Sequence, residues 1–311
     1  MTKFNPENVL LQDSPHGEIP KEQGTLIIKE IMDNSIVTKL AKYEPMTKPI
    51  KEFDYLAEGP GAYWVNESEK IETSKAKWLR VTMEAKKLGV IIPVSKEFLN
   101  YSVPNFFNII KPKIAEAFQN KFDEAALFGK DSPYKTGISI YEKAKAAGHE
   151  IAQTKDTYAD LNNLMALVED GDNEPQAFAT TRKFNQNLRG AVDKIGLPIF
   201  NDARQGVTAS ALGLPVTYGS RKAWDYDKAL LFTGDFDTAM YGILQNIEYA
   251  ISEDATLSTI TDEKGEPINL FERDMFALRA TMHIGFMTVK DDAFALLKKG
   301  TAEKGTAEAT S

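Results

Sequence analysis

The clearest pattern of apolar and polar positions lies in residues 102–129, SVPNFFNIIKPKIAEAFQNKFDEAALFG. Apolar residues recur every three to four positions and polar residues fill the gaps, which predicts one long amphipathic helix over 103–128. Ser102 can cap its start, and Gly129 is the residue type that ends many helices. Pro112 lies inside the predicted helix and lacks an amide hydrogen, so a bend is expected there.

The second informative pattern covers residues 50–85. Residues 50–57, IKEFDYLA, resemble a strand, and Gly59 and Gly61 flank a proline in a tight-turn signal. Two faces then alternate strictly over 78–85, which predicts the returning strand. The region is therefore expected to form a long two-stranded ribbon with a charged middle.

The predicted ribbon carries three aromatic residues that need a covering surface, Tyr63, Trp64 and Trp78. A two-stranded ribbon is only marginally stable alone in water, so these rings are expected to pack against something. That surface is either a partner or the body of the same chain, and the pattern leaves both readings open.

The rest of the chain alternates shorter elements. Helices are predicted at 21–34, 96–101, 142–147, 158–170, 182–194, 270–276 and 291–298. Strands are predicted at 35–46, 89–94, 177–181, 213–218, 229–233, 247–251 and 277–289. An extended arm is expected at the start, a loop at 196–210 and a disordered tail at 300–311. The fold class is therefore α+β, with an α/β unit in the middle third.

Composition narrows the classes of function. The chain has 311 residues, 42% hydrophobic and 26% charged, as an ordinary globular protein does. It has no cysteine, which excludes a disulfide framework, a thiolate metal site and a cysteine nucleophile. A net charge of −8 argues against a protein that binds DNA chiefly by neutralising phosphates. The start lacks a signal-peptide pattern and no apolar run is long enough to span a membrane, so no membrane partner is expected.

Candidate chemistry is sparse. No histidine lies in a catalytic motif, and there is no phosphate-binding loop or nucleophile elbow. The pairs Asp225/Asp227 and Asp235/Asp237 could supply hard oxygen ligands to a divalent cation, which keeps a metal-dependent hydrolase as a minor alternative. Solvated turns and helix caps explain the same residues more simply. We therefore expect no enzyme activity, no cofactor and no metal site.

Several stretches, in order, resemble the major capsid proteins of tailed bacteriophages with the Hong Kong 97 fold. The stretches that carry this resemblance are 86–99, 114–129, 212–216, 233–236, 277–286 and 292–295. Residues 43–46 and 61–65 are most similar to capsid proteins of siphophages from Gram-positive hosts.

The resemblance implies a role for each part. It implies an N-terminal arm (1–35), a peripheral domain (36–49, 86–134 and 246–299) with a spine helix (103–128), an extended loop (50–85), an axial domain (135–245) and a disordered tail (300–311). The extended loop would reach over a neighbouring subunit. The candidate inter-subunit contact residues are Gly59, Gly61, Tyr63, Trp64, Lys70, Lys75, Trp78 and Arg80.

The function implied is that of a major capsid protein that self-assembles into an icosahedral head shell enclosing double-stranded DNA. The partners would be copies of itself in hexamers and pentamers, a scaffolding protein, a portal protein and DNA bound without sequence specificity. The protein would be assembled in the bacterial host cytoplasm and would reside in the virion capsid. An encapsulin-type compartment shell is the alternative within the fold, although encapsulins usually lack such a ribbon. A carbohydrate-binding or decoration protein would need an exposed aromatic platform.

Two family features differ in this chain. Some relatives form Lys–Asn cross-links between subunits, but 252–266 holds no asparagine, leaving Asn246 and Asn269 as distant candidates. No cross-linking is therefore expected. Some relatives also begin with a long scaffolding segment that is cut away, whereas here the arm begins almost at once. A separate scaffolding protein, or a processed chain, is expected instead.

Overall fold

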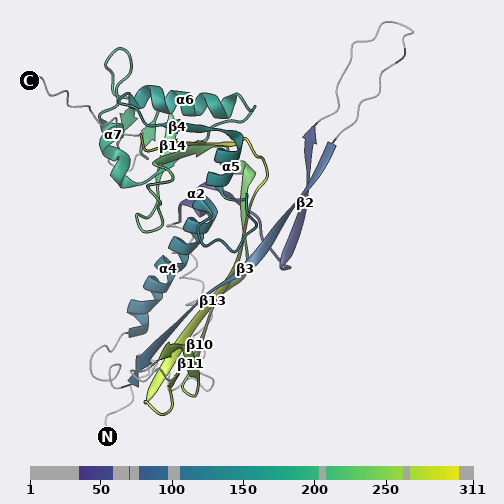
Figure 1. Cartoon of the computed structure of the whole chain (residues 1–311), viewed down its shortest axis with the longest axis vertical. Helices are drawn as coiled ribbons and strands as arrows, with labels where there is room; N and C mark the ends of the chain where they lie inside the picture. Colours follow the sequence, from purple (N-terminus) through teal and green to yellow (C-terminus); the bar gives the residue numbers. More distant parts are fainter. Residues whose placement is uncertain are drawn as a thin grey trace, which may run out of the picture.

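The computed structural model describes residues 35–58, 70, 77–96, 106–202, 208–261 and 267–300. These residues form a long sheet and a second, compact sheet, with a long helix lying beside the first and shorter helices covering the second (Figure 1). The mixed α+β class is confirmed. The predicted arm, the ribbon tip, the helices at 21–34 and most of 96–101, and the tail from 301 lie outside the described residues.

The long sheet has five strands in the order β1-β10-β13-β3-β2. Its strands are β1 (Lys42–Tyr43), β2 (Ile50–Glu58), β3 (Lys77–Ser95), β10 (Ala239–Ser252) and β13 (Met275–Thr288). The central strand, β13, pairs antiparallel with β10 on one side and β3 on the other. At 19 residues, β3 is about 60 Å long, so one strand belongs both to the sheet and to the hairpin with β2.

The compact sheet has seven strands in the order β4-β14-β9-β5-β8-β7-β6. Its strands are β4 (Glu150–Ala152), β5 (Ala177–Thr180), β6 (Phe200–Asn201), β7 (Ser210–Ala211), β8 (Leu214–Tyr218), β9 (Leu231–Gly234) and β14 (Phe294–Lys298). Every residue of β5 and β9 is buried, because neighbours cover both faces of the sheet. Helix α6 (Thr157–Glu169) contributes Leu161, Leu164 and Val168 to this core. The remaining pair is β11 (Thr256–Thr261) with β12 (Pro267–Asn269).

Helix α4 (Phe106–Phe128) is the predicted long helix. Ile114, Phe118 and Phe122 are buried in the largest core, where the ring of Phe122 meets that of Phe286 edge-on at 6.2 Å. The helix ends at Gly129, whose φ of +65° is the left-handed conformation expected there. Its predicted first residues lie outside the described part, and the bend at Pro112 stays a prediction.

The sequence prediction was wrong at the start of the described chain. Residues 35–46 were expected to form a strand, but 36–40 form a short helix, α2 (Ile36–Leu40), and only β1 is extended. The local pattern favoured a strand, yet Ser35 caps the helix and its first backbone amides bond to a carboxylate on α4. A distant contact thus overrode local propensity.

Two predicted helices near the end of the chain are also wrong. Residues 270–274 form a turn, because the side chain of Asn269 accepts the amide hydrogens of Phe271 and Glu272. The second, expected at 291–298, is the strand β14, which lies between β4 and β9. A short apolar run fits a buried strand as well as a buried helix, and here the gap in the sheet decides.

Two further predictions need smaller corrections. The helix expected at 182–194 is only a 3₁₀ turn, η2 (Arg182–Phe184), followed by α7 (Asn185–Arg189), which ends at Gly190. The Thr181 hydroxyl pairs with that of Tyr226 and provides no side-chain cap. The buried strand expected at 89–94 is the second half of β3, and Ile91 within it is half exposed.

Most of the other predicted elements match the structure closely, but the strand expected at 247–251 is only the last part of β10 (Ala239–Ser252). Helix α5 (Ile140–Ala147) begins with a capping box between Ser139 and Glu142, and η3 (Phe236–Thr238) begins after Asp235. Sheet membership differs from the expected domain division, because β14 joins the compact sheet and β10 begins at Ala239. None of the described helices is long and apolar enough to cross a membrane.

Candidate assembly surface

The hairpin of β2 and β3 projects from the body of the molecule (Figure 1). Its strands pair from Ile50↔Glu84 to Glu58↔Lys77. Neighbouring residues of a strand point to opposite faces, and Trp78 and Leu79 are 64% and 49% exposed, so both faces of the hairpin are open at this point. Trp78 therefore does not pack on the body of its own chain. It is a large apolar side chain available to a neighbour.

Arg80 lies on the same hairpin and is held by charge. Its Nε is 3.0 Å from Oδ1 of Asp54, its partner across the strands, and its Nη1 is 3.2 Å from Oε2 of Glu52. All three side chains are more than half exposed, so these ion pairs add little to stability but fix the guanidinium in place. Lys70 is exposed as well.

The other predicted contact residues cannot be placed. Gly59, Gly61, Tyr63, Trp64 and Lys75 lie outside the described residues, so their role stays a prediction. Within the described part, the structure brings Trp78 and Arg80 together on one strand.

A glycine pair forms the root of the hairpin. Gly242 of β10 lies opposite Gly285 of β13. A Cβ atom on Gly242 would lie 2.4 Å from the carbonyl oxygen of Glu44, and one on Gly285 would lie 2.9 Å from Sδ of Met46. The chain entering the hairpin crosses the sheet at this point, and only glycine leaves it room. In the sequence, Gly285 lies inside the strand predicted at 277–289, and Gly242 lies just before the strand predicted at 247–251. Neither glycine was predicted to mark a crossing of the chain.

An apolar tip lies at the far end of the compact sheet, between α7 and β6. Val192, Ile195 and Leu197 are exposed there, Ile195 at 86%. The side chain of Asp193 accepts the amide hydrogens of Ile195 at 2.9 Å and of Leu197 at 2.8 Å, so the loop is held in a defined shape. Apolar residues on a preformed surface loop are typical of a contact surface. The sequence prediction divided this region between a helix at 182–194 and a loop at 196–210, and it missed the exposed apolar surface.

Asp123 of α4 anchors the beginning of the described chain. Its carboxylate is fully buried and accepts hydrogen bonds from the Ser35 hydroxyl and from the amides of Ile36 and Val37, at 3.2 and 3.4 Å. Burial raises the pKa of Asp123 to about 6, although these hydrogen bonds and the charge of Lys39 oppose the rise.

The helical pattern had placed Asp123 on the polar side of the helix, together with Lys111 and Gln119. All three are buried in the structure. For Asp123 the cause is α2, which lies against α4 and covers this side of it. A single sequence cannot indicate this contact, because Ser35 and Ile36 lie 88 and 87 residues away from Asp123 along the chain.

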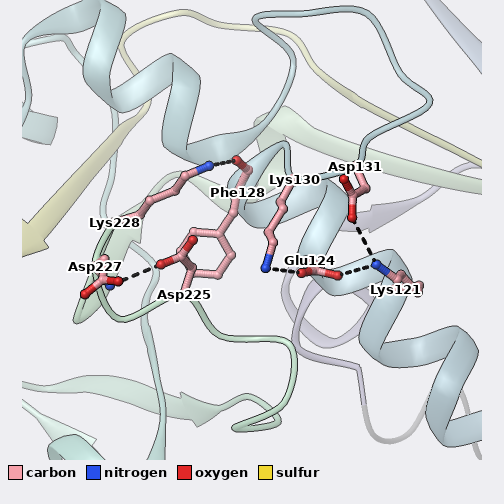
Figure 2. Close-up of polar contacts among 8 residues, drawn as sticks. All are labelled: Lys121, Glu124, Phe128, Lys130, Asp131, Asp225, Asp227 and Lys228. Carbon is pink, nitrogen blue, oxygen red and sulfur yellow. Dashed lines mark hydrogen bonds and ion pairs between the residues drawn. The ribbon is translucent and has the colours of Figure 1, made fainter.

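Cations also surround the C-terminal end of α4, as Figure 2 shows. Nζ of Lys228 donates to the carbonyl oxygen of Phe128 at 3.0 Å, while Glu124 lies between Lys121 at 2.8 Å and Lys130 at 2.9 Å. Positive groups at a helix C-terminus oppose its partial negative charge. The 114–129 stretch therefore ends in a hydrogen-bonded junction with the loop that precedes β9 (Leu231–Gly234).

The two acidic pairs, Asp225/Asp227 and Asp235/Asp237, stabilise local turns of the backbone. Asp225 accepts the amide hydrogen of Asp227 at 3.1 Å (Figure 2), and Asp235 accepts that of Asp237 at 3.2 Å. Asp237 also accepts a hydrogen bond from Gln176. Among the described residues there is no group of three or more acidic or histidine side chains that could hold a metal ion. The geometry supports the structural reading of these aspartates.

The projecting hairpin, the long helix beside a long sheet and the separate compact sheet together define the Hong Kong 97-type capsid fold. The model of the phage capsid family matches residues 18–299. The chain therefore belongs to the phage capsid family, which confirms the resemblance seen in the sequence.

Individual relatives agree. The major capsid protein of Staphylococcus phage 80alpha is 44% identical over 295 residues, covering 94% of this chain and 89% of the relative. The probable major capsid protein of Mycobacterium phage D29 is 25% identical, covering 90% of each chain. A solved structure from Microbacterium phage Oxtober96 has a TM-score of 0.74 at 26% identity, covering 86% of this chain and 91% of the other.

Proposed function

We propose that this chain is the major capsid protein of a tailed phage and builds the closed icosahedral head shell around double-stranded DNA. The observation that carries the proposal is the 44% identity, over 94% of the chain, to a major capsid protein. The exposed hairpin and apolar tip support it, because both are surfaces that copies of the same chain would cover.

The sheets suggest how the parts divide. The long sheet with α4 would be the peripheral domain, and the compact sheet, including β14, the axial domain at the centres of hexamers and pentamers. The hairpin would reach over a neighbouring subunit. Each contact can be weak, because every subunit makes several and closure of the shell multiplies them.

The remaining partners follow from the same proposal. A scaffolding protein would guide assembly in the host cytoplasm, a portal protein would occupy one vertex, and packaged DNA would fill the virion. With a net charge of −8, the chain would enclose DNA without sequence-specific binding. The proposal assigns no enzymatic activity to the chain.

Covalent cross-linking between subunits is not part of the proposal. The side-chain oxygen of Asn269 already accepts the amide hydrogens of Phe271 and Glu272, which leaves Asn246 as the exposed asparagine of the two. Purified particles should run as one band of 34.6 kDa on a denaturing gel. A ladder of multimers would contradict this.

Electron microscopy tests the proposal directly. The purified chain, expressed with and without the neighbouring scaffold gene, should form closed shells of uniform diameter in at least one sample. Dispersed monomers in both samples would overturn it. Shells that enclose a protein cargo instead of nucleic acid would point to the encapsulin-type alternative.

A further inference from the structure

A cleft of about 620 Å³ lies between α4, the end of α2 and the start of η2. Its walls include Lys39 of α2, Lys113 and Glu116 of α4, Arg182 of η2, and Tyr218 at the end of β8. Ile36 joins the two sides, because a Cβ atom on Gly219, which also lines the cleft, would lie 3.4 Å from its Cδ1 atom. The cleft is thus built from elements far apart in the sequence.

The cleft is positively charged in an acidic protein. Its one lining carboxylate, Glu116, is already shared by Lys113 at 3.1 Å and Lys222 at 2.7 Å, and these lysines lower the pKa of Glu116. The guanidinium of Arg182 lies 5.2 Å from the centre of the Tyr218 ring. Neither Arg182 nor Lys39 forms an ion pair within the described part of the chain. The positive charge of Lys39 does act at longer range on buried Asp123, whose pKa it lowers.

The described chain begins at Ser35, beside this cleft. Residues 1–34 carry six carboxylates and three lysines, a net side-chain charge of −3. They join Ser35, which is fixed to Asp123, and Gln119, one helical turn from Asp123, lines the cleft. In the helix that the sequence predicts for 21–34, the five residues from Glu30 to Ser35 span about 7.5 Å, more than the roughly 6 Å along α4 from Asp123 to Gln119 at the cleft wall.

We propose that this cleft binds an acidic stretch of the same chain, residues 18–34, with Glu30 and Asp33 paired with Lys39 and Arg182. Acids three residues apart share one face of a helix, the conformation the sequence predicts for 21–34. A cleft of this size accommodates a few amino-acid residues, whereas a DNA duplex is too wide to enter it. The binding lies within one chain, so it does not depend on shell formation.

Cross-linking of dispersed subunits tests the proposal. The chain has no cysteine, so Ile31→Cys with Ser220→Cys supplies the only two thiols while leaving every charge in place. Ser220 lines the cleft. A short bismaleimide should join the two thiols within one chain at least about 10-fold faster than in the matched control, Ile31→Cys with Asn162→Cys, whose second site is exposed on α6.

Charge reversal tests the chemistry. In the cross-linking pair, Arg182→Glu should slow the reaction about 10-fold, adding Glu30→Arg should restore it, and Arg182→Lys should keep most of it. Lys155→Glu, the same charge change at an exposed site elsewhere, should have no effect. Circular dichroism should show that each variant is folded.

Three results would overturn the proposal. Equal rates for the cleft pair and the Asn162 control would show that residue 31 has no preferred position. Cross-linking only between chains would place the acidic stretch on a second copy. Inhibition by a short DNA duplex, with no response to Glu30→Arg, would make the cleft a nucleic-acid site. A failure to form shells would contradict the proposed function but leave these outcomes unchanged.

Discussion

The two sheets of this protein differ in how completely a single chain buries the side chains of their strands. In the compact sheet, β5 and β9 are buried at every position within a single chain. In the long sheet, β3 is the longest strand, yet of its described side chains only Met83 and Val94 are buried. The centre of the compact sheet therefore buries its apolar side chains within one chain, whereas β3 leaves some of its own, such as Trp78 and Leu79, exposed to a neighbour. A shell subunit needs both, since it must fold before it assembles.

The largest expected effect concerns the compact sheet, which is buried within one chain. Phe232 is fully buried, with its ring 5.4 Å from that of Phe128 and 5.6 Å from that of Trp224. Phe232→Ala should lower the free energy of unfolding by about 3–5 kcal/mol, because it removes a large side chain and leaves a cavity. Urea denaturation of dispersed subunits measures this. A loss below about 1 kcal/mol would mean that the compact sheet is not complete within one chain.

Trp78→Ala tests the exposed hairpin of the long sheet. Because Trp78 is exposed, the substitution should change the unfolding free energy of dispersed subunits by less than about 0.5 kcal/mol. Assembly should weaken by about 2–4 kcal/mol per contact, as for a buried tryptophan at an interface. Light scattering against subunit concentration gives the assembly threshold, and Trp78→Phe is the conservative control. Normal assembly of the alanine variant would remove Trp78 from the interface.

Asp123 joins the beginning of the described chain to α4, and its pKa gives a pH test. The folded pKa of about 6 exceeds the ordinary 3.8, so the folded state holds the proton more tightly between these values. This group's contribution to stability is therefore greatest below pH 4 and is lost as pH rises through 6. Between pH 5 and 7 the wild type should lose about 1 kcal/mol relative to Asp123→Asn, by urea unfolding at both pH values. An equal pH dependence in both proteins would contradict the assignment.

Local patterns predicted what local physics determines. The period of α4, its stop at Gly129 and the alternation of β3 are set within the segments themselves, and they were predicted correctly. The helix α2 was missed because a carboxylate 87 residues away caps it. Strand β14 was missed because its neighbours in the sheet, not its own pattern, decide that it is extended.

The candidate surface was predicted only where an exposed pattern stood out. Trp78 stood out as an aromatic residue of the predicted ribbon, Arg80 was a contact candidate implied by the resemblance, and both lie exposed on β3. Their role as contact residues stays a prediction. The apolar tip at Ile195 and the crossing at Gly242 were not predicted, because each depends on backbone shape. A single sequence shows which residues are apolar but not which of them the fold leaves uncovered.

The smallest expected effect on stability is that of Arg80→Ala, and it tests whether the hairpin of β2 and β3 is independent of the folded body. Its two ion pairs, to Asp54 and Glu52, join exposed side chains across the hairpin. If the hairpin packs only against a neighbouring subunit, Arg80→Ala should leave the unfolding free energy of dispersed subunits almost unchanged, and added salt should remove any small difference. Urea denaturation at low and high salt measures both. A large, salt-independent loss of stability would mean that the hairpin is part of the folded body, and the contrast between the two sheets would then fail.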